Sequence, residues 1–144
     1  MRQSRGRIWT ARALIGLVLL SNVQCAVAFL IRPEVYAPGF ELAGAVGAGM
    51  VRGMGILFLM WNVPYAFAAW NPVTRRVSLV EAILMQAIGF AGEAILQMTL
   101  PREYATAHQS IWRFILFDGA GLLFLILAWW ITRRHTHRVD RAIS

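Results

Sequence analysis

The chain has 144 residues, of which 58% are hydrophobic and 15% charged, and its mean hydropathy is +0.57. Soluble domains usually carry about 25% charged residues, so this composition excludes an ordinary soluble domain. The sequence contains 14 arginines and no lysine, and against seven acidic residues these give a formal net charge of +7. Because most of these arginines flank apolar runs, their placement indicates membrane topology, and we expect no nucleic-acid partner.

Four segments are long and apolar enough to cross a bilayer, because its ~30 Å hydrocarbon core requires ~20 apolar helical residues. They cover about residues 9–31, 43–70, 77–100 and 111–132. The connections between them contain turn-forming stretches, RPEVYAPGFE, NPVTRR and PREYATAHQ. We therefore predict an all-α, integral membrane four-helix bundle that forms one domain, with a short basic tail at 133–144.

The first apolar run has two interpretations. The stretches MRQSRGRIWTAR and ALIGLVLLSNV, followed by Ala26–Ala28, together resemble a cleavable signal peptide. The apolar run continues through Ile31, however, to the length of a full span, which favours an uncleaved helix. Cys25, the single cysteine, cannot form an internal disulfide, and we expect it to be a small core residue.

The positive-inside rule predicts that both termini are cytoplasmic. Ten arginines precede or open the first span, lie between the second and third, or follow the fourth: Arg2, Arg5, Arg7, Arg12, Arg75, Arg76, Arg133, Arg134, Arg138 and Arg141. The opposite side has three arginines and three glutamates: Arg32, Arg102, Arg113, Glu34, Glu41 and Glu103. Tryptophans such as Trp9, Trp70 and Trp129 fall near the predicted boundaries, as is typical of membrane interfaces.

Each predicted span carries a strongly polar residue in the half of the membrane remote from the termini. Counted inward at ~1.5 Å per residue, Arg52 and Asn22 lie ~14 Å deep, whereas Glu93 and Asp118 lie ~10 Å deep. On the third span, Gln86, Glu93 and Gln97 follow the spacing i, i+7, i+11 and share one helix face. We expect an intramembrane polar layer formed by Arg52, Glu93, Asp118, Asn22, Gln97 and Gln86. A weaker polar layer nearer the cytoplasm contains Asn62, Tyr65, Glu81 and Gln86.

A charge at the centre of a membrane helix costs at least ~2.5–3.5 kcal/mol, so Arg52 requires a partner. We predict that it pairs with Glu93 or Asp118. Gly49 and Gly53 form a G-x-x-x-G pair, which predicts that a neighbouring helix approaches closely there. The polar layer is either a ligand-binding site or a structural clamp that selects which helices pack together, and the sequence leaves both open.

The sequence contains none of the common nucleotide-binding, metal-binding or catalytic motifs: it has no Walker, Rossmann, H-E-x-x-H, G-x-S-x-G or C-x-x-C pattern. The three histidines, His108, His135 and His137, all lie outside the predicted spans. The sequence therefore indicates no catalytic residue, no metal site and no cofactor, and favours a protein that is not an enzyme.

Four features follow one another along the chain: a short basic N-terminus, GAGMVRGMGILFL with Arg52–Gly53, the loop NPVTRR, and the closing WWITRR. In this order they resemble small DoxX-like four-helix membrane proteins, and also an uncharacterised bacterial family of the same layout. The resemblance implies a four-helix bundle in a bacterial cytoplasmic membrane. DoxX-like proteins are linked to quinone-related and redox-stress membrane complexes, often as partner subunits. The resemblance does not assign a quinone-related role to any particular residue of this chain.

The leading functional expectation is a non-catalytic accessory or assembly subunit of a larger membrane complex. Its partners are membrane lipids and either other membrane subunits or further copies of itself. The alternative is a small transporter or a binder of an amphipathic anion, quinone or lipid, in which Arg52 holds the anionic group and Glu93 or Asp118 relays a proton. A third class is a membrane enzyme that uses the same residues as acid and base.

Overall fold

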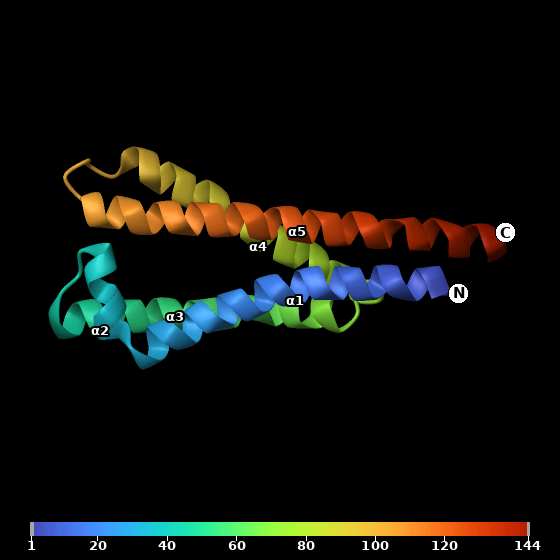
Figure 1. Ribbon diagram of the computed structural model, residues 1–144, viewed down its shortest axis with the longest axis horizontal. Helices are drawn as coiled ribbons and strands as arrows, with labels where there is room; N and C mark the ends of the chain where they lie inside the picture. The colour runs from blue at the N-terminus through green and yellow to red at the C-terminus, as the bar shows by residue number, and fades with distance from the viewer. Residues whose placement is uncertain (1, 144) are drawn as a thin grey trace.

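The computed structural model describes the backbone of residues 2–143 and the side chains of residues 5–133. The described chain is all-α, as predicted, and has four long helices: α1 (Arg2–Ile31), α3 (Gly44–Trp70), α4 (Arg76–Thr99) and α5 (Ala105–Ile143). A short helix α2 (Pro33–Tyr36) and a 3₁₀ helix η1 (Ala37–Phe40) fill the connection between α1 and α3. The outer ends of α1 and α5, toward the two chain termini, lie at the same end of the molecule (Figure 1).

All four long helices are long and apolar enough to cross a membrane. α3 and α4 begin and end within a residue of the predicted spans, whereas α5 begins at Ala105 instead of residue 111 and extends to Ile143. The difference arises because hydropathy marks only the apolar part of a helix, and the residues that begin α5 are polar but compatible with a helix. The predicted basic tail is thus helical backbone as far as Ile143, while the side chains of His135 and His137 lie outside the described residues.

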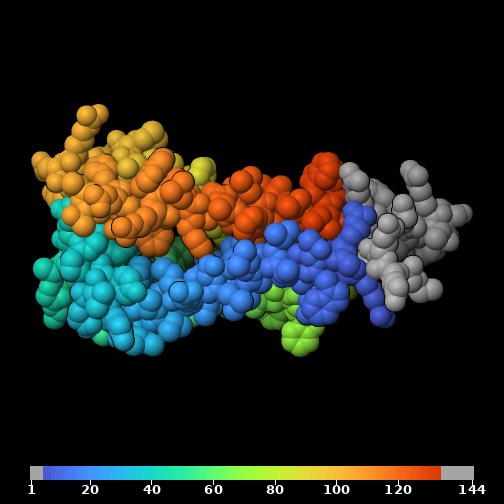
Figure 2. All heavy atoms as spheres, viewed as in Figure 1, coloured from blue at the N-terminus to red at the C-terminus, as the bar shows by residue number. Residues whose placement is uncertain are grey.

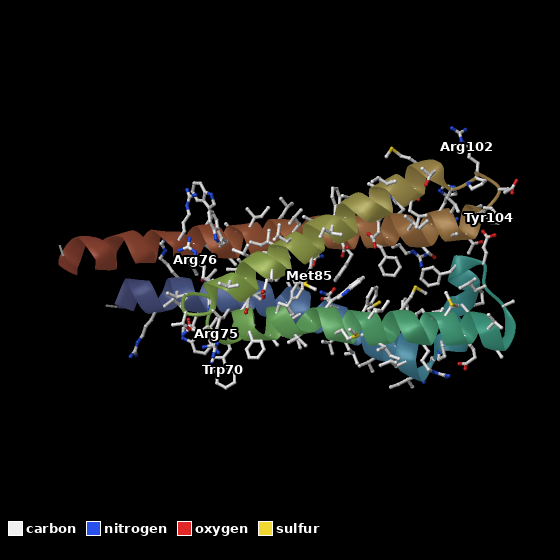
Figure 3. The ribbon with its side chains drawn as sticks, turned by 180° about the vertical axis from the view of Figure 1, so that it is seen from behind. Trp70, Arg75, Arg76, Met85, Arg102 and Tyr104 are labelled. Atoms are coloured by element: carbon white, nitrogen blue, oxygen red, sulfur yellow. The ribbon has the colours of Figure 1, made fainter. Side chains whose placement is uncertain are left out.

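The long helices pack as neighbours around the molecule: α1 contacts α3 and α5, and α4 contacts α5 and α3. α4 runs obliquely across the back of the molecule, from the turn after Trp70 at Arg75 to the end marked by Arg102 and Tyr104 (Figure 3). Two apolar clusters fill the interior. One contains Ile15, Leu79 and Leu125, and the other contains Phe29 and Val51, with the rings of Phe40, Phe58 and Phe114 packed against them.

The connection between α1 and α3 is ordered by contacts with α5. Pro33 ends α1, because proline restricts the residue before it and has no N–H for the helix. Glu41 ends η1 with a left-handed φ of 57°, and its Oε1 accepts hydrogen bonds from the backbone N–H groups of Thr106 (3.1 Å) and Ala107 (3.3 Å). Ser110 Oγ donates to the carbonyl of Gly39 at 2.6 Å. The connection and the beginning of α5 therefore form one cap at this end of the molecule.

α1 and α3 approach each other closely at Gly55. A Cβ atom added there would lie 2.9 Å from the backbone oxygen of Ala26. Gly49 and Gly53 do not make the predicted close helix contact, because no atom of the described chain would lie within 4 Å of a Cβ atom at either. The reason is helical phase: Gly55 shares the buried face of Val51 and Asn62, whereas Gly49 and Gly53 do not.

Candidate functional site

A chain of hydrogen bonds links α3, α4 and α5 inside the bundle. Tyr65 Oη donates to Gln86 Oε1 at 2.5 Å, and Gln86 Nε2 donates to Asp118 Oδ1 at 2.9 Å. Tyr65 and Gln86 are each only 3% exposed. An aspartate carboxylate can only accept hydrogen bonds, so it requires the NH₂ side of the Gln86 amide and leaves Oε1 for the tyrosine hydroxyl. The three side chains therefore orient one another.

Two glycines make room for this chain. A Cβ atom at Gly121 of α5 would lie 2.7 Å from Gln86 Nε2, and one at Gly89 of α4 would overlap Asp118 Oδ2. Because Gly121 has no side chain, the Gln86 amide lies directly against the backbone of α5. Because Gly89 has no side chain, the carboxylate of Asp118 on α5 lies directly against the backbone of α4. Both glycines are thus required by the position of the polar groups.

Further along α4, two polar side chains each have an oxygen that receives no hydrogen bond. Glu93 Oε2 and Gln97 Oε1 are buried, and neither accepts a hydrogen bond from any described residue. A third such atom is Oδ1 of Asn62, whose Nδ2 donates to the Phe58 carbonyl at 2.6 Å. All three atoms are hydrogen-bond acceptors, and a buried acceptor without a donor costs about 1–3 kcal/mol. These three oxygens are therefore buried acceptors that no described residue satisfies.

Arg52 does not supply the missing donor. Its side chain is 53% exposed, and one of its terminal nitrogens lies 3.9 Å from Glu34 Oε1 on α2. The predicted pairing with Glu93 or Asp118 is therefore wrong for the described chain. Val51 faces the buried side of α3, and the next residue is rotated by about 100° around the helix axis, which turns Arg52 outward. The sequence did not show that α2 returns along α3 and brings Glu34 to this face.

The remaining predicted residue, Asn22, is half-buried on α1 and has no hydrogen-bond partner among the described side chains. Of the six predicted residues, the structure joins only Gln86 and Asp118 directly. Tyr65, which the sequence placed in the weaker layer, is their third partner. A long helical side chain points toward the N-terminus of its own helix, and this lifts the Tyr65 hydroxyl toward the other two.

The end of the molecule that holds both termini is rich in arginine. Arg12 Nε donates to the carbonyl of Ala69 at 3.0 Å, and a terminal nitrogen of Arg7 donates to the carbonyl of Ile131 at 3.1 Å. The Arg12 guanidinium lies 4.4 Å from the ring centroid of Trp9, and that of Arg133 lies 4.2 Å from that of Trp130. Arg12 and Arg7 thus join α1 to α3 and to α5, and Arg12 and Arg133 each lie against a tryptophan of their own helix.

The described residues contain no group of three or more histidine, cysteine or acidic side chains that could hold a metal ion, so no metal site is assigned. Comparison of the chain with family models, curated proteins and solved structures found no match in any of the three. Its function is therefore inferred from the residues and their geometry.

Proposed function

We propose that this chain is a multi-pass protein of the bacterial cytoplasmic membrane, with both termini in the cytoplasm. Its four apolar helices support membrane insertion. Arginine–tryptophan contacts at the end that holds the termini are typical of a membrane interface, and the excess of arginine there favours the cytoplasmic side. The bacterial membrane rests on the resemblance to DoxX-like proteins.

The position of Arg52 agrees with such a placement. α3 has 27 residues and is about 40 Å long, which exceeds the ~30 Å hydrocarbon core. If Trp70 marks the cytoplasmic interface, Arg52 precedes it by 18 residues (70 − 52) and lies about 27 Å away. This placement puts Arg52 near the opposite interface, in place of the ~14 Å depth expected from the sequence. There the arginine side chain reaches the headgroup region and Glu34.

Within the membrane, the chain acts as an accessory or assembly subunit of a larger complex. The observation that carries this proposal is the pair of buried acceptors on α4, Glu93 Oε2 and Gln97 Oε1. Glu93 and Gln97 are half-buried residues, so each side chain can turn from its unsatisfied position toward a partner outside the bundle. Lipid tails cannot donate hydrogen bonds, so a donor from another membrane helix is the natural partner for these side chains. Gly92, beside Glu93, is exposed, and no described atom lies within 4 Å of where its Cβ atom would be. A partner helix can therefore approach α4 closely at this level.

The double variant Glu93→Leu/Gln97→Leu tests the subunit role. Both side chains become apolar, so we expect the isolated chain to keep its helix content, measured by circular dichroism, while its companions are lost from gently extracted complexes. The readout is the native mass in nanodiscs, together with identification of the proteins that travel with the chain. Met98→Leu is the matched control, because Met98 is 77% exposed on the same turn. A wild-type chain that travels alone, or a double variant that keeps its companions, contradicts the proposal.

A second candidate function is a small transporter or ligand binder. It is favoured by the chain Tyr65–Gln86–Asp118, which places a carboxylate inside the bundle. The free groups near it are acceptors, so a ligand at this site has to bring donors, such as an ammonium or hydroxyl group. An amphipathic anion bound by Arg52 would instead lie on the outer face of α3, beside Glu34.

Asp118→Asn separates the two candidates. The asparagine nearly preserves the size of the side chain, so a binder should lose ligand affinity or transport while companion proteins, if present, stay bound. A subunit should keep its companions and show no ligand in either form. Isothermal calorimetry with amine-bearing and hydroxyl-bearing amphiphiles measures the affinity.

A further inference from the structure

A groove lies between α1 and α5, where the two helices run side by side along the face drawn in Figure 2. Its volume is about 180 Å³, and it is lined by residues within 17–21 of α1 and 117–124 of α5. Ser21 is the only lining side chain that can form hydrogen bonds, since the others are apolar or glycine. Leu17 is 52% exposed and Ala120 is also exposed, so the groove opens at the surface of the bundle.

Arg7 lies on the line of contact between α1 and α5, called the seam below, on the side of the groove toward the chain termini. A terminal nitrogen of Arg7 on α1 donates to the carbonyl of Ile131 on α5, so its guanidinium bridges the two helices. The side chain is exposed, and a guanidinium has five N–H donors, which leaves others for a second acceptor. Along α5, the groove begins at Phe124, seven residues from Ile131 (131 − 124), or about 10 Å. It ends at Phe117, fourteen residues from Ile131 (131 − 117), or about 21 Å.

We propose that an anionic phospholipid of the leaflet next to the chain termini binds along this seam, with its phosphate at Arg7 and one acyl chain in the groove. One leaflet contributes about 15 Å to the ~30 Å hydrocarbon core, so an acyl chain from a headgroup at Arg7 reaches the groove. The groove is too small for a membrane helix, which is about 10–12 Å across with its side chains. The positive charge of Arg7 complements a phosphate, and the apolar walls complement a hydrocarbon chain. This inference requires the proposed membrane insertion but not the subunit role.

The chain offers a matched control for each half of the site. Arg5 is exposed at the same end but is rotated by about 200° around α1 from Arg7, away from the seam. Arg5→Gln and Arg7→Gln therefore change the net charge equally, and only the second removes a seam contact. Ala91 of α4 is exposed like Ala120 but does not line the groove. Ala120→Leu fills the groove, whereas Ala91→Leu adds the same atoms elsewhere.

The test uses the full chain, delipidated in detergent and offered equal amounts of phosphatidylglycerol and phosphatidylcholine, with bound lipid counted by native mass spectrometry. We expect one phosphatidylglycerol to be retained in preference to phosphatidylcholine. Arg7→Gln should lower this preference about fivefold, the effect of one arginine on an anionic lipid, and Arg5→Gln should leave it within about twofold. Ala120→Leu should reduce the retention of both lipids, and Ala91→Leu should not. Inorganic phosphate at millimolar concentration should not displace the lipid.

Equal effects of Arg5→Gln and Arg7→Gln overturn the proposal, because they indicate only general attraction to a basic surface. Equal retention by Ala120→Leu and Ala91→Leu removes the acyl-chain site, and full displacement by inorganic phosphate reduces the site to one for a small anion. Thermal unfolding midpoints report whether each variant is folded. If Ala120→Leu is destabilised, Leu17→Trp, on the exposed wall of the groove, replaces it and carries the same expectation.

Discussion

Gln86 of α4 forms side-chain hydrogen bonds with both α3 and α5. Its amide accepts from Tyr65 of α3 and donates to Asp118 of α5, and both of its polar atoms are used in a position that is only 3% exposed. Replacing Tyr65 leaves Gln86 Oε1 without its donor, whereas replacing Asp118 leaves Gln86 Nε2 only a longer hydrogen bond, 3.4 Å, to the backbone oxygen of residue 118. Buried polar networks of this kind are specific because each member has one arrangement that satisfies the others.

Tyr65→Phe tests the importance of this chain for stability. The variant keeps the ring but removes the donor to Gln86 Oε1, so we expect a loss of about 1–2 kcal/mol in the free energy of unfolding. The measurement is the thermal unfolding midpoint in detergent. Tyr104→Phe is the control, because Tyr104 is 40% exposed, and its midpoint should match that of the wild type. Equal midpoints for both variants would show that the hydroxyl of Tyr65 contributes no stability.

At the scale of the elements, the beginning of α5 depends on a residue far away in the sequence. Glu41 Oε1 accepts from the N–H groups of Thr106 and Ala107, which have no partner within their own helix. Glu41→Ala should cost about 1 kcal/mol, as the loss of a helix cap does, with an added loss of the charge that favours a helix N-terminus. Hydrogen exchange of the first turn of α5 should rise. Glu103→Ala, an exposed change at the same end, should leave that exchange unaltered.

The packing of α1 on α3 depends on Gly55. Gly55→Ala brings a Cβ atom to 2.9 Å from the backbone oxygen of Ala26, and backbone atoms move less readily than a side-chain end. We expect a cost of about 1–3 kcal/mol, as for other overpacked contacts. Gly53→Ala is the control: its Cβ atom meets nothing within 4 Å, and the change should stabilise the helix by up to about 1 kcal/mol. Unfolding midpoints that shift in the same direction would refute this account of the interface.

At the scale of the whole molecule, the proposed topology is tested by cysteine labelling. In a Cys25→Ala background, Glu103→Cys should react with an impermeant maleimide added to intact cells. Thr74→Cys should react only after the membrane is opened, because the 71–75 turn lies at the opposite end from residue 103 (Figure 3). Both positions are exposed, so access to the reagent alone decides the result. The reverse pattern would place the termini outside the cell.

Sequence by itself determined the helical class and the four apolar helices. Length and hydropathy are local properties, and a run of about 20 apolar residues in α-helical form spans the bilayer core whatever its neighbours are. Helical phase likewise predicted that Gln86 lies on one face with Glu93 and Gln97, and all three have buried polar atoms in the structure. Hydropathy did not predict the polar first turn of α5 or the two helical turns that follow α1.

Only the tertiary structure decided which polar groups meet. Depth along a helix can be counted from the sequence, but the direction of a side chain depends on the rotation of its helix about its own axis and on the neighbours it contacts. A rotation of about 100° between adjacent residues separates buried Val51 from exposed Arg52, and so directs the arginine toward Glu34 and away from Asp118. The same dependence on helix rotation places the close contact at Gly55 instead of at Gly49 and Gly53.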